Sequence, residues 1–186
     1  MTGAQDVIAG YSPRVAQPFS RYRYGYQMPA PLSSHELADL LPGTWTIAAT
    51  NFPFWLNGER TEARLNYSVR TAEPLVIDDV VEYLNAAGVE KRIVGVDRLR
   101  GGVFTWRGKG LLTPLTSRWA VTGWNHDRSI VTIQYDKSRV TPAGLDILIR
   151  ADSPPRDIRS AVASDSSSFG LTAEQFASLS WDLPRR

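Results

Sequence analysis

The stretch that decides the fold is Gly101–Arg150, which contains GGVFTWRGKGLL (101–112), SRWAVTGW (117–124), SIVTIQYDK (129–137) and TPAGLDILIR (141–150). Each segment is rich in β-branched and aromatic residues and is followed by turn-forming residues such as proline, asparagine or serine. The pattern predicts four consecutive strands joined by short connections. Such a meander cannot bury its aromatic face alone, so it needs further strands from elsewhere in the chain.

The chain upstream supplies four more strands, of which Arg60–Arg70 is the clearest. It alternates apolar and polar residues over eleven positions, as expected of a strand with one dry and one wet face. Thr61, Ala63, Leu65, Tyr67 and Val69 form the dry face. Further strands are predicted at about Thr44–Phe54, Leu75–Asn85 and Lys91–Leu99.

No helix of crossover length separates these eight segments, so the sheet is expected to be antiparallel. Eight antiparallel strands with one apolar face favour a closed up-and-down barrel, because closure removes the exposed sheet edges. A barrel of this size can enclose one small ligand. We therefore predict a mainly β domain over residues 33–186, preceded by an N-terminal arm over residues 1–32.

A short helix is predicted before the first strand, because Ser33 and Glu36 have the capping-box spacing. Its buried stripe is Leu37, Leu40 and Leu41, and Pro42-Gly43 ends it. After the barrel, which ends at Pro154-Pro155, we expect a polar linker over Ser160–Ser168. A last helix then runs from a cap at Thr172 to about Leu179, with Phe176, Leu179 and Trp181 packing on the outer wall.

Composition excludes several classes of function. The 21 lysines and arginines are scattered and nearly balanced by 19 acidic residues, which argues against nucleic-acid binding. The chain has no cysteine and only two histidines, so we expect no disulfide, no thiolate nucleophile, no metal site and no cofactor. It shows neither a secretory leader nor a spanning apolar run, which predicts a cytoplasmic protein without a membrane span.

The arm carries an aromatic run in which Tyr22, Tyr24 and Tyr26 alternate with Arg21, Arg23 and Gly25. This pattern predicts an extended segment with one aromatic face, and we expect residues 19–28 to form a lid over the open end of the barrel. Two alternatives remain open. The arm could pack against a second subunit of a homodimer, or it could be a disordered leader.

Gly43-Thr44-Trp45, at the start of the first strand, resembles the Gly-x-Trp signature of the lipocalins. Trp106–Gly110, Ser117–Trp119 with Gly123-Trp124, and Thr141–Asp146 resemble a group of calycin-like microbial proteins. The resemblance covers about residues 40–150. It implies a lipocalin-like barrel in which Trp45 closes the floor and Arg150 stacks over its ring.

The resemblance also implies a cup with an apolar interior, and strand parity suggests which residues line it. Trp45, Ile47, Ala49 and Asn51 are expected to share the inner face of the first strand. Trp119 and Trp124 have opposite parity, so one is expected inside and the other outside. The predicted ligand-binding residues are Tyr22, Tyr24, Tyr26, Asn51, Tyr67, Trp106, Trp119, Trp124 and Tyr135. The alternative is that these aromatic residues only fill a core.

The sequence contains no recognisable nucleophile–base set, so no catalytic residue can be assigned from it. Asp79, Glu82, Asp97 and Asp146 fall within predicted strands, and most of them are expected to face solvent. One that faced inward would be a candidate acid or base, because desolvation raises the pKa of a carboxyl group.

Two function classes fit these observations. The first is a cofactor-independent cyclase or isomerase that acts on a hydrophobic polyketide- or terpenoid-like molecule. Its architecture would be similar to that of the tetronate [4+2] cyclases, which need neither metal nor triad and work by positioning and polarising their substrate. The second is a non-catalytic intracellular carrier of a hydrophobic small molecule. The aromatic arm and the expected cytoplasmic location favour the enzyme.

Overall fold

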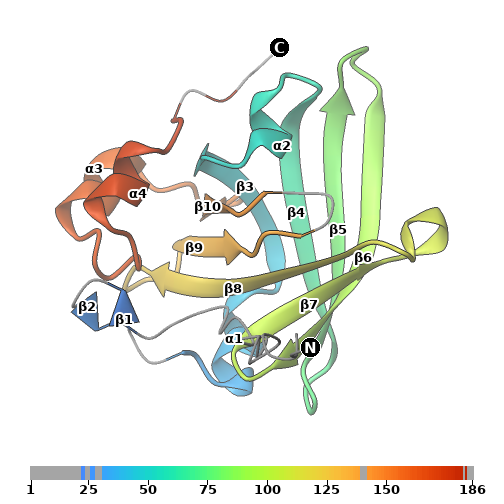
Figure 1. The fold of residues 1–186 in the computed structure, drawn as a ribbon, viewed down its shortest axis with the longest axis horizontal. Coiled ribbons are helices and arrows are strands. Elements are labelled where there is room, and N and C mark those ends of the chain that lie inside the picture. Colours follow the sequence, from blue (N-terminus) through green and yellow to red (C-terminus); the bar gives the residue numbers. More distant parts are fainter. Residues whose placement is uncertain (1–21, 24–25, 28–30, 139–141, 182, 184–186) are drawn as a thin grey trace, which may run out of the picture.

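The computed structural model describes residues 22–23, 26–27, 31–138, 142–181 and 183, with only the backbone of the first four. Within this part of the chain, eight antiparallel strands close into a barrel in the order β10-β3-β4-β5-β6-β7-β8-β9 (Figure 1). Each strand pairs with its neighbours in sequence, and β10 pairs back onto β3. The predicted up-and-down barrel is therefore confirmed. The strands are β3 (Gly43–Thr50), β4 (Arg60–Thr71), β5 (Val76–Asn85), β6 (Glu90–Arg100), β7 (Val103–Gly108), β8 (Thr116–Trp124), β9 (Ile130–Tyr135) and β10 (Gly144–Arg150).

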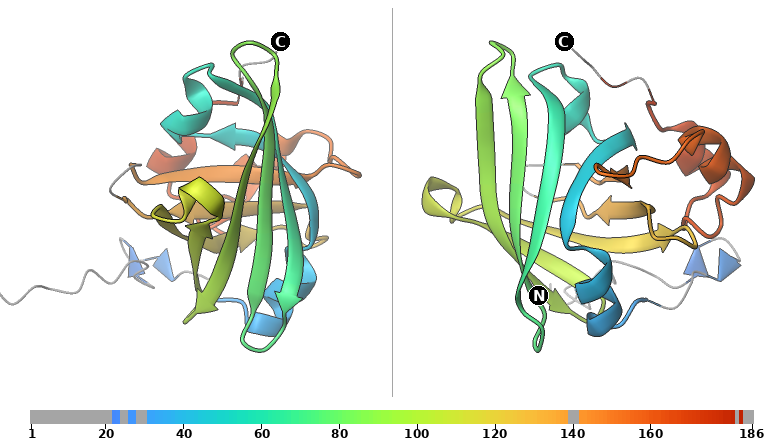
Figure 2. Two further views of the ribbon diagram at one scale, coloured as in Figure 1. Left: turned by 90° about the vertical axis from the view of Figure 1, so that its right-hand side faces the viewer. Right: turned by 180° about the vertical axis from the view of Figure 1, so that it is seen from behind.

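Short helices lie at both ends and on one side of this barrel. They are α1 (Ser34–Leu40), α2 (Pro53–Leu56), the 3-10 turn η1 (Gly110–Leu112), α3 (Ile158–Ser164) and α4 (Ala173–Ala177). The views of Figure 2 place α1 at one end, while α2 and the β5–β6 connection lie at the other. Phe52 and Pro53, expected to continue the first strand, instead leave it and begin α2, because proline suits a helix start better than a ladder.

The end covered by α1 is closed by Trp45 and Arg150, as predicted. Trp45 is fully buried, and its indole Nε1 donates to the Leu41 carbonyl over 2.8 Å. The Arg150 guanidinium lies 4.0 Å from the centre of the Trp45 ring and donates to the carbonyls of Leu40 and Pro42 at 2.5 and 2.6 Å. Gly43 has a φ of +115°, and a Cβ there would lie 2.7 Å from the Arg150 guanidinium. The glycine of the Gly-x-Trp motif thus makes room for the arginine.

The capping residues of α1 and α4 form as predicted. The Ser33 hydroxyl accepts from the Glu36 amide, and the Glu36 carboxylate accepts from the Ser33 amide. Thr172 and Gln175 form the same reciprocal pair at the start of α4. These bonds satisfy amide groups that the first turn of a helix otherwise leaves free.

A second apolar cluster lies outside the barrel, under α3 and α4. Outward side chains of β3, β9 and β10 pack there against the C-terminal segment, which confirms the predicted docking of the last helix. The polar linker expected over Ser160–Ser168 is wrong for its first half, because α3 runs through Ser164. Val162 is fully buried in the cluster and anchors that helix despite its serine-rich sequence. The buried members are Ala49, Ile130, Leu145, Ile147, Ile149, Val162, Phe169, Leu171 and Leu179.

Gly123 is where β8 touches this C-terminal segment most closely. A Cβ at this position would lie 2.2 Å from the Phe169 Cα. The clash is with backbone, so relieving it requires a shift of the main chain that destabilises the fold. We expect Gly123→Ala to lower the free energy of unfolding by about 1–3 kcal/mol and to speed proteolysis of residues 151–181. Thr122→Ser, its neighbour in β8, is the control. Equal thermal melts and digestion rates for the two variants would contradict the prediction.

Two register shifts decide which side chains enter the barrel. In the β3–β10 ladder, Leu148 pairs with Ile47 but Ile147 pairs with Ala49, so β3 gains one residue. Ala49 therefore packs in the outer cluster, and the expectation that it lines the interior is wrong. In β8 a second shift between Val121 and Gly123 restores the inward parity of Trp124. A bulge of this kind moves every following side chain to the opposite face.

Candidate functional site in the barrel interior

Three carboxyl groups are buried inside the barrel. Asp79 on β5 is 7% exposed, whereas Asp97 on β6 and Asp146 on β10 are fully buried. The expectation that most of the four strand carboxylates face solvent is therefore wrong. Only Glu82 points outward, where it pairs with Arg92 at 3.3 Å. Asp79 and Asp97 lie on neighbouring strands, two register positions apart, so their side chains share the inner face.

Asp79 and Asp97 form a carboxyl pair. Trp119 Nε1 donates to Asp97 Oδ1 at 2.7 Å, while Asp97 Oδ2 and Asp79 Oδ1 have no donor among the described residues. Burial raises the pKa of Asp79 to about 7. Burial and the charge of Asp79 together raise the pKa of Asp97 well above its usual range. Two carboxyl groups this close cannot both ionise easily, so at neutral pH Asp97 keeps a proton that it can share with Asp79.

Asp146 is held by three neutral donors. Thr50 Oγ1 donates to Asp146 Oδ1, and Trp55 Nε1 and the Tyr135 hydroxyl each donate to Oδ2 at 3.2 Å. Burial raises the pKa of Asp146 to about 6, and the three hydrogen bonds limit that rise. At neutral pH this group is mostly a carboxylate, in contrast to Asp97.

Tyr67 lies between these two carboxyl sites. Its ring is 5% exposed and stacks on Trp119 with the ring centres 5.8 Å apart. Burial and then the charges of Asp79, Asp97 and Asp146 raise the pKa of its hydroxyl well above 10. The phenol therefore stays protonated, close to all three carboxyl groups.

Aromatic rings form the wall around these groups. Phe104 stacks on Trp119 with the ring centres 4.5 Å apart, and Phe52 stacks on Tyr135 with the ring centres 5.1 Å apart. Trp106 covers Gly95, where a Cβ would lie 2.0 Å from the indole nitrogen. The strand positions at Gly95 and Trp106 pair directly with Asp79 and Asp97, so this indole lies beside the carboxyl pair.

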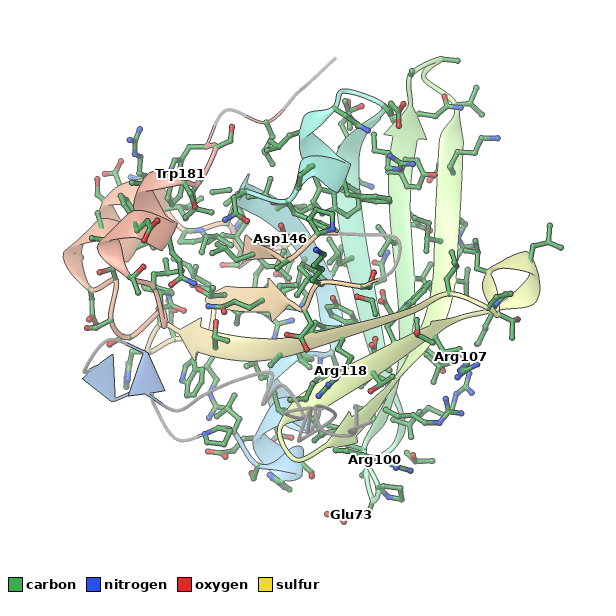
Figure 3. All side chains as sticks on the ribbon, in the orientation of Figure 1. Glu73, Arg100, Arg107, Arg118, Asp146 and Trp181 are labelled. Atoms are coloured by element: carbon green, nitrogen blue, oxygen red, sulfur yellow. The ribbon has the colours of Figure 1, made fainter. Side chains whose placement is uncertain are left out.

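Most of the basic side chains on the strands point away from the barrel, and Figure 3 shows Arg100 and Arg107 projecting from β6 and β7. Arg60 is an exception, since its Nε is buried and its guanidinium lies 4.0 Å from the centre of the Phe54 ring and 5.7 Å from that of Tyr83. Among the described residues, every ion pair between basic and acidic side chains involves carboxylates other than the three buried ones. Nor do the described residues group three or more histidine, aspartate or glutamate side chains where they could hold a metal ion. The interior is thus acidic and aromatic, and none of its three carboxyl groups forms an ion pair with a described residue.

The structure brings together five of the residues predicted to bind a ligand, which all pack in or against the barrel core: Tyr67, Trp106, Trp119, Trp124 and Tyr135. Asn51 lies elsewhere, since its side chain accepts from the Leu145 amide and donates to Ser178 Oγ. Trp124 packs against the same core, so the expectation that Trp119 and Trp124 face opposite sides is wrong.

The predicted lid falls on the arm. The structure gives Tyr22–Arg23 (β1) and Tyr26–Gln27 (β2) as a two-stranded antiparallel ribbon. Tyr24 and the side chains of Tyr22 and Tyr26 lie outside the described residues. Their role as a lid, like the ligand-binding role of the other predicted residues, stays a prediction.

The sequence analysis did not predict that the three aspartates are buried inside the barrel. Strand parity could have identified two of them. Asp79 lies on the same face of its strand as Ile77 and Val81, and Asp97 lies on the same face as Ile93 and Leu99. Asp146 gives no such signal, since both faces of β10 are apolar. Its donors Thr50 and Trp55 depend on the bulge in β3 and on α2.

No protein-family model matches this chain, and no curated protein does. Many solved structures do. The amine-binding protein of Rhodnius prolixus, solved with tryptamine, has a TM-score of 0.55 at 13% identity, covering 81% of this chain and 82% of its own. Apocrustacyanin C1 has a TM-score of 0.54 at 10% identity, covering 82% and 87%.

The chain has the lipocalin fold. Lobster apocrustacyanin A1, at a TM-score of 0.51 and 10% identity, covers 82% of this chain and 87% of its own length. At these identities the similarity establishes the fold alone. Among the described residues, no helix of this lipocalin-like chain is long and apolar enough to cross a membrane.

Proposed function

We propose that this barrel binds a hydrophobic small molecule beside Asp79 and Asp97 and acts on it as a cofactor-independent isomerase or cyclase. One observation carries the proposal: a buried carboxyl pair that holds one proton near neutral pH, set in an aromatic wall. Acid–base catalysts work best when their pKa lies near the working pH. Perturbed pKa values of this kind are concentrated at functional sites.

The three carboxyl groups can divide the work. Asp97 keeps its proton and can donate it to an acceptor atom of the bound molecule. Asp146, with a pKa of about 6, is ionised and can take a proton from another atom of that molecule. One proton enters and one leaves, so the formula of the substrate is unchanged and no oxidant or reductant is needed. Isomerisation and cyclisation both meet that balance.

A carrier without catalysis is the second candidate. It is supported by the apolar interior and by the amine-binding protein of similar fold, which was solved with tryptamine in place. In that case the aspartates only recognise the ligand. The two candidates share a binding site and differ in whether the bound molecule changes.

The test begins with the molecule that co-purifies with the protein, extracted and identified by mass spectrometry. This molecule is then incubated with fresh protein, and NMR measures its conversion to an isomer. We expect the protein to interconvert the two. At saturating concentrations of the molecule, Asp97→Asn is expected to lower the rate by 10²-fold or more, the usual contribution of a general acid. Glu82→Gln, a carboxylate of the same barrel that faces outward, is expected to match the unaltered protein.

The result that decides for the carrier is equally clear. If the extracted molecule binds to the unaltered protein and to Asp97→Asn with no conversion in either, the catalytic proposal fails. Equal rates for Asp97→Asn and Glu82→Gln would remove Asp97 from the mechanism.

A further inference from the structure

The carboxyl pair leaves hydrogen-bond acceptors without donors. Asp79 Oδ1 and Asp97 Oδ2 are both buried and unpaired among the described residues, whereas nearly all buried polar atoms in proteins have a partner. Asp146 differs, because three donors surround it. A proton shared between the two carboxyl groups can bridge these two oxygens, and it is lost when both groups ionise. The described chain provides no other donor to these two atoms.

Tyr67 lies near the carboxyl pair. Its side chain is more than nine-tenths buried, and this burial, together with the charges of Asp79 and Asp97, raises the pKa of its hydroxyl. Tyr67 and Trp119 stack, and Trp119 in turn holds Asp97. The unpaired oxygens of Asp79 and Asp97 and the Tyr67 side chain thus share one region of the inner face of β4–β6.

The titratable groups at that place are all acids, namely three carboxyl groups and two tyrosine hydroxyls. Asp79 comes from β5, Asp97 from β6 and Asp146 from β10, with the hydroxyls of Tyr67 on β4 and Tyr135 on β9 facing them. None of these groups can carry a positive charge.

We propose that the molecule bound in this barrel carries a basic nitrogen, which is held as an ammonium or iminium group by Asp79 and Asp97 beside Tyr67, with its apolar part against the aromatic wall. The nitrogen supplies the N–H donors that the pair lacks, and its charge is neutralised without a buried residue of the chain. A metal ion suits the site less well, since no described group of three ligands is placed to hold one. The inference rests on ligand binding at this site and is independent of catalysis.

Proton release follows from this arrangement. A cation beside the pair favours the ionised form of both carboxyl groups, so Asp97 gives up its proton when an ammonium ion binds. If the free amine enters instead, an ammonium ion in solution first loses a proton to the buffer. The bound amine then takes the proton of the carboxyl O–H on its nitrogen lone pair. Either route releases up to one proton per bound cation at neutral pH. An uncharged ligand releases none.

The experiment uses the full chain, freed of co-purifying molecules, and calorimetric titration at pH 7.5 in phosphate and in HEPES. The probes are 2-phenylethylamine, tryptamine and dodecylamine, each compared with the alcohol that has hydroxyl in place of the amino group. At least one amine is expected to bind ten-fold or more tightly than its alcohol. Its binding heat is expected to differ between the two buffers by an amount that corresponds to proton release.

Variants locate the effect. Asp79→Asn and Asp97→Asn, with folding checked by circular dichroism, are each expected to reduce the preference for amine over alcohol by ten-fold or more. Glu82→Gln is expected to keep it. Failure of all three amines to bind, or alcohols that bind as tightly as amines, would overturn the inference. If amines bind as described but no co-purified molecule is converted, the catalytic proposal fails and this inference stands.

Discussion

Replacing Arg150 with alanine is expected to lower the free energy of unfolding by about 3 kcal/mol. The substitution removes a guanidinium from the Trp45 ring and leaves the carbonyls of Leu40 and Pro42 without their donors. A cation–π contact contributes roughly 0.5–2 kcal/mol, and each unpaired buried carbonyl costs about 1–3 kcal/mol. In a domain of this size we expect the melting temperature to fall by roughly 10 °C.

Two further variants show whether geometry or charge carries this effect. Arg150→Lys keeps the charge but cannot direct a planar fork at both carbonyls, so an intermediate loss is expected. Arg98→Ala removes an exposed arginine from the outer wall and is expected to change the free energy of unfolding by less than about 0.5 kcal/mol. Urea unfolding curves measure all three. Similar losses for Arg150→Ala and Arg98→Ala would show that the closed end does not depend on Arg150.

Asp79→Asn is expected to stabilise the protein at pH 8 and to have little effect at pH 4.5. The pKa of Asp79 is about 7 in the folded protein against 3.8 for an unperturbed group. Because the folded state binds the proton more tightly, its stability is highest at low pH and falls as the pH rises from about 4 to 7. At 1.36 kcal/mol per unit, the ionisation of Asp79 removes about 4 kcal/mol over that range.

The measurement is the free energy of unfolding at half-unit steps from pH 4.5 to pH 8. The unaltered protein should become less stable across this range, and Asp79→Asn should flatten the decline and gain about 2–4 kcal/mol at pH 8. Asp78→Asn is the matched control, because this neighbour faces outward and pairs with Arg70 and Lys109, which lower its pKa. Its stabilising charge is lost only in acid, so it should leave the slope unchanged. Parallel curves for Asp79→Asn and the unaltered protein would disprove the burial of that charge.

Much of the fold could be predicted because local patterns already contain it. The alternation of Arg60–Arg70 fixes the inner face of β4, where Ala63, Leu65 and Tyr67 pack in the core. Trp45 and Arg150 could be paired from a short motif and the end of the last strand. The caps at Ser33 and Thr172 follow from spacings of three residues. Each of these features depends on neighbours in sequence or on one recurring contact.

The candidate site could be predicted only in part. Tyr67, Trp119 and Tyr135 were named from aromatic positions in alternating strands, and all three lie at the carboxyl groups. The aspartates were expected in solvent, because an isolated buried carboxylate is costly. That expectation is wrong here, since Trp119, Thr50, Trp55 and Tyr135 donate to Asp97 or Asp146, and a shared proton removes one charge.

The sequence by itself determined that eight strands close into a barrel, which residue seals its floor, and that aromatic rings fill its interior. A period of two and a few short motifs suffice for this, because they act between residues close in the chain. Tertiary structure alone decided that aspartates from β5, β6 and β10 are buried inside, two of them as a pair. Whether a strand position faces inward after a bulge depends on the register of its partner strand, and a single inserted residue reverses it. The pKa of each carboxyl group then depends on burial and on donors up to 96 residues away along the chain, as Thr50 is from Asp146.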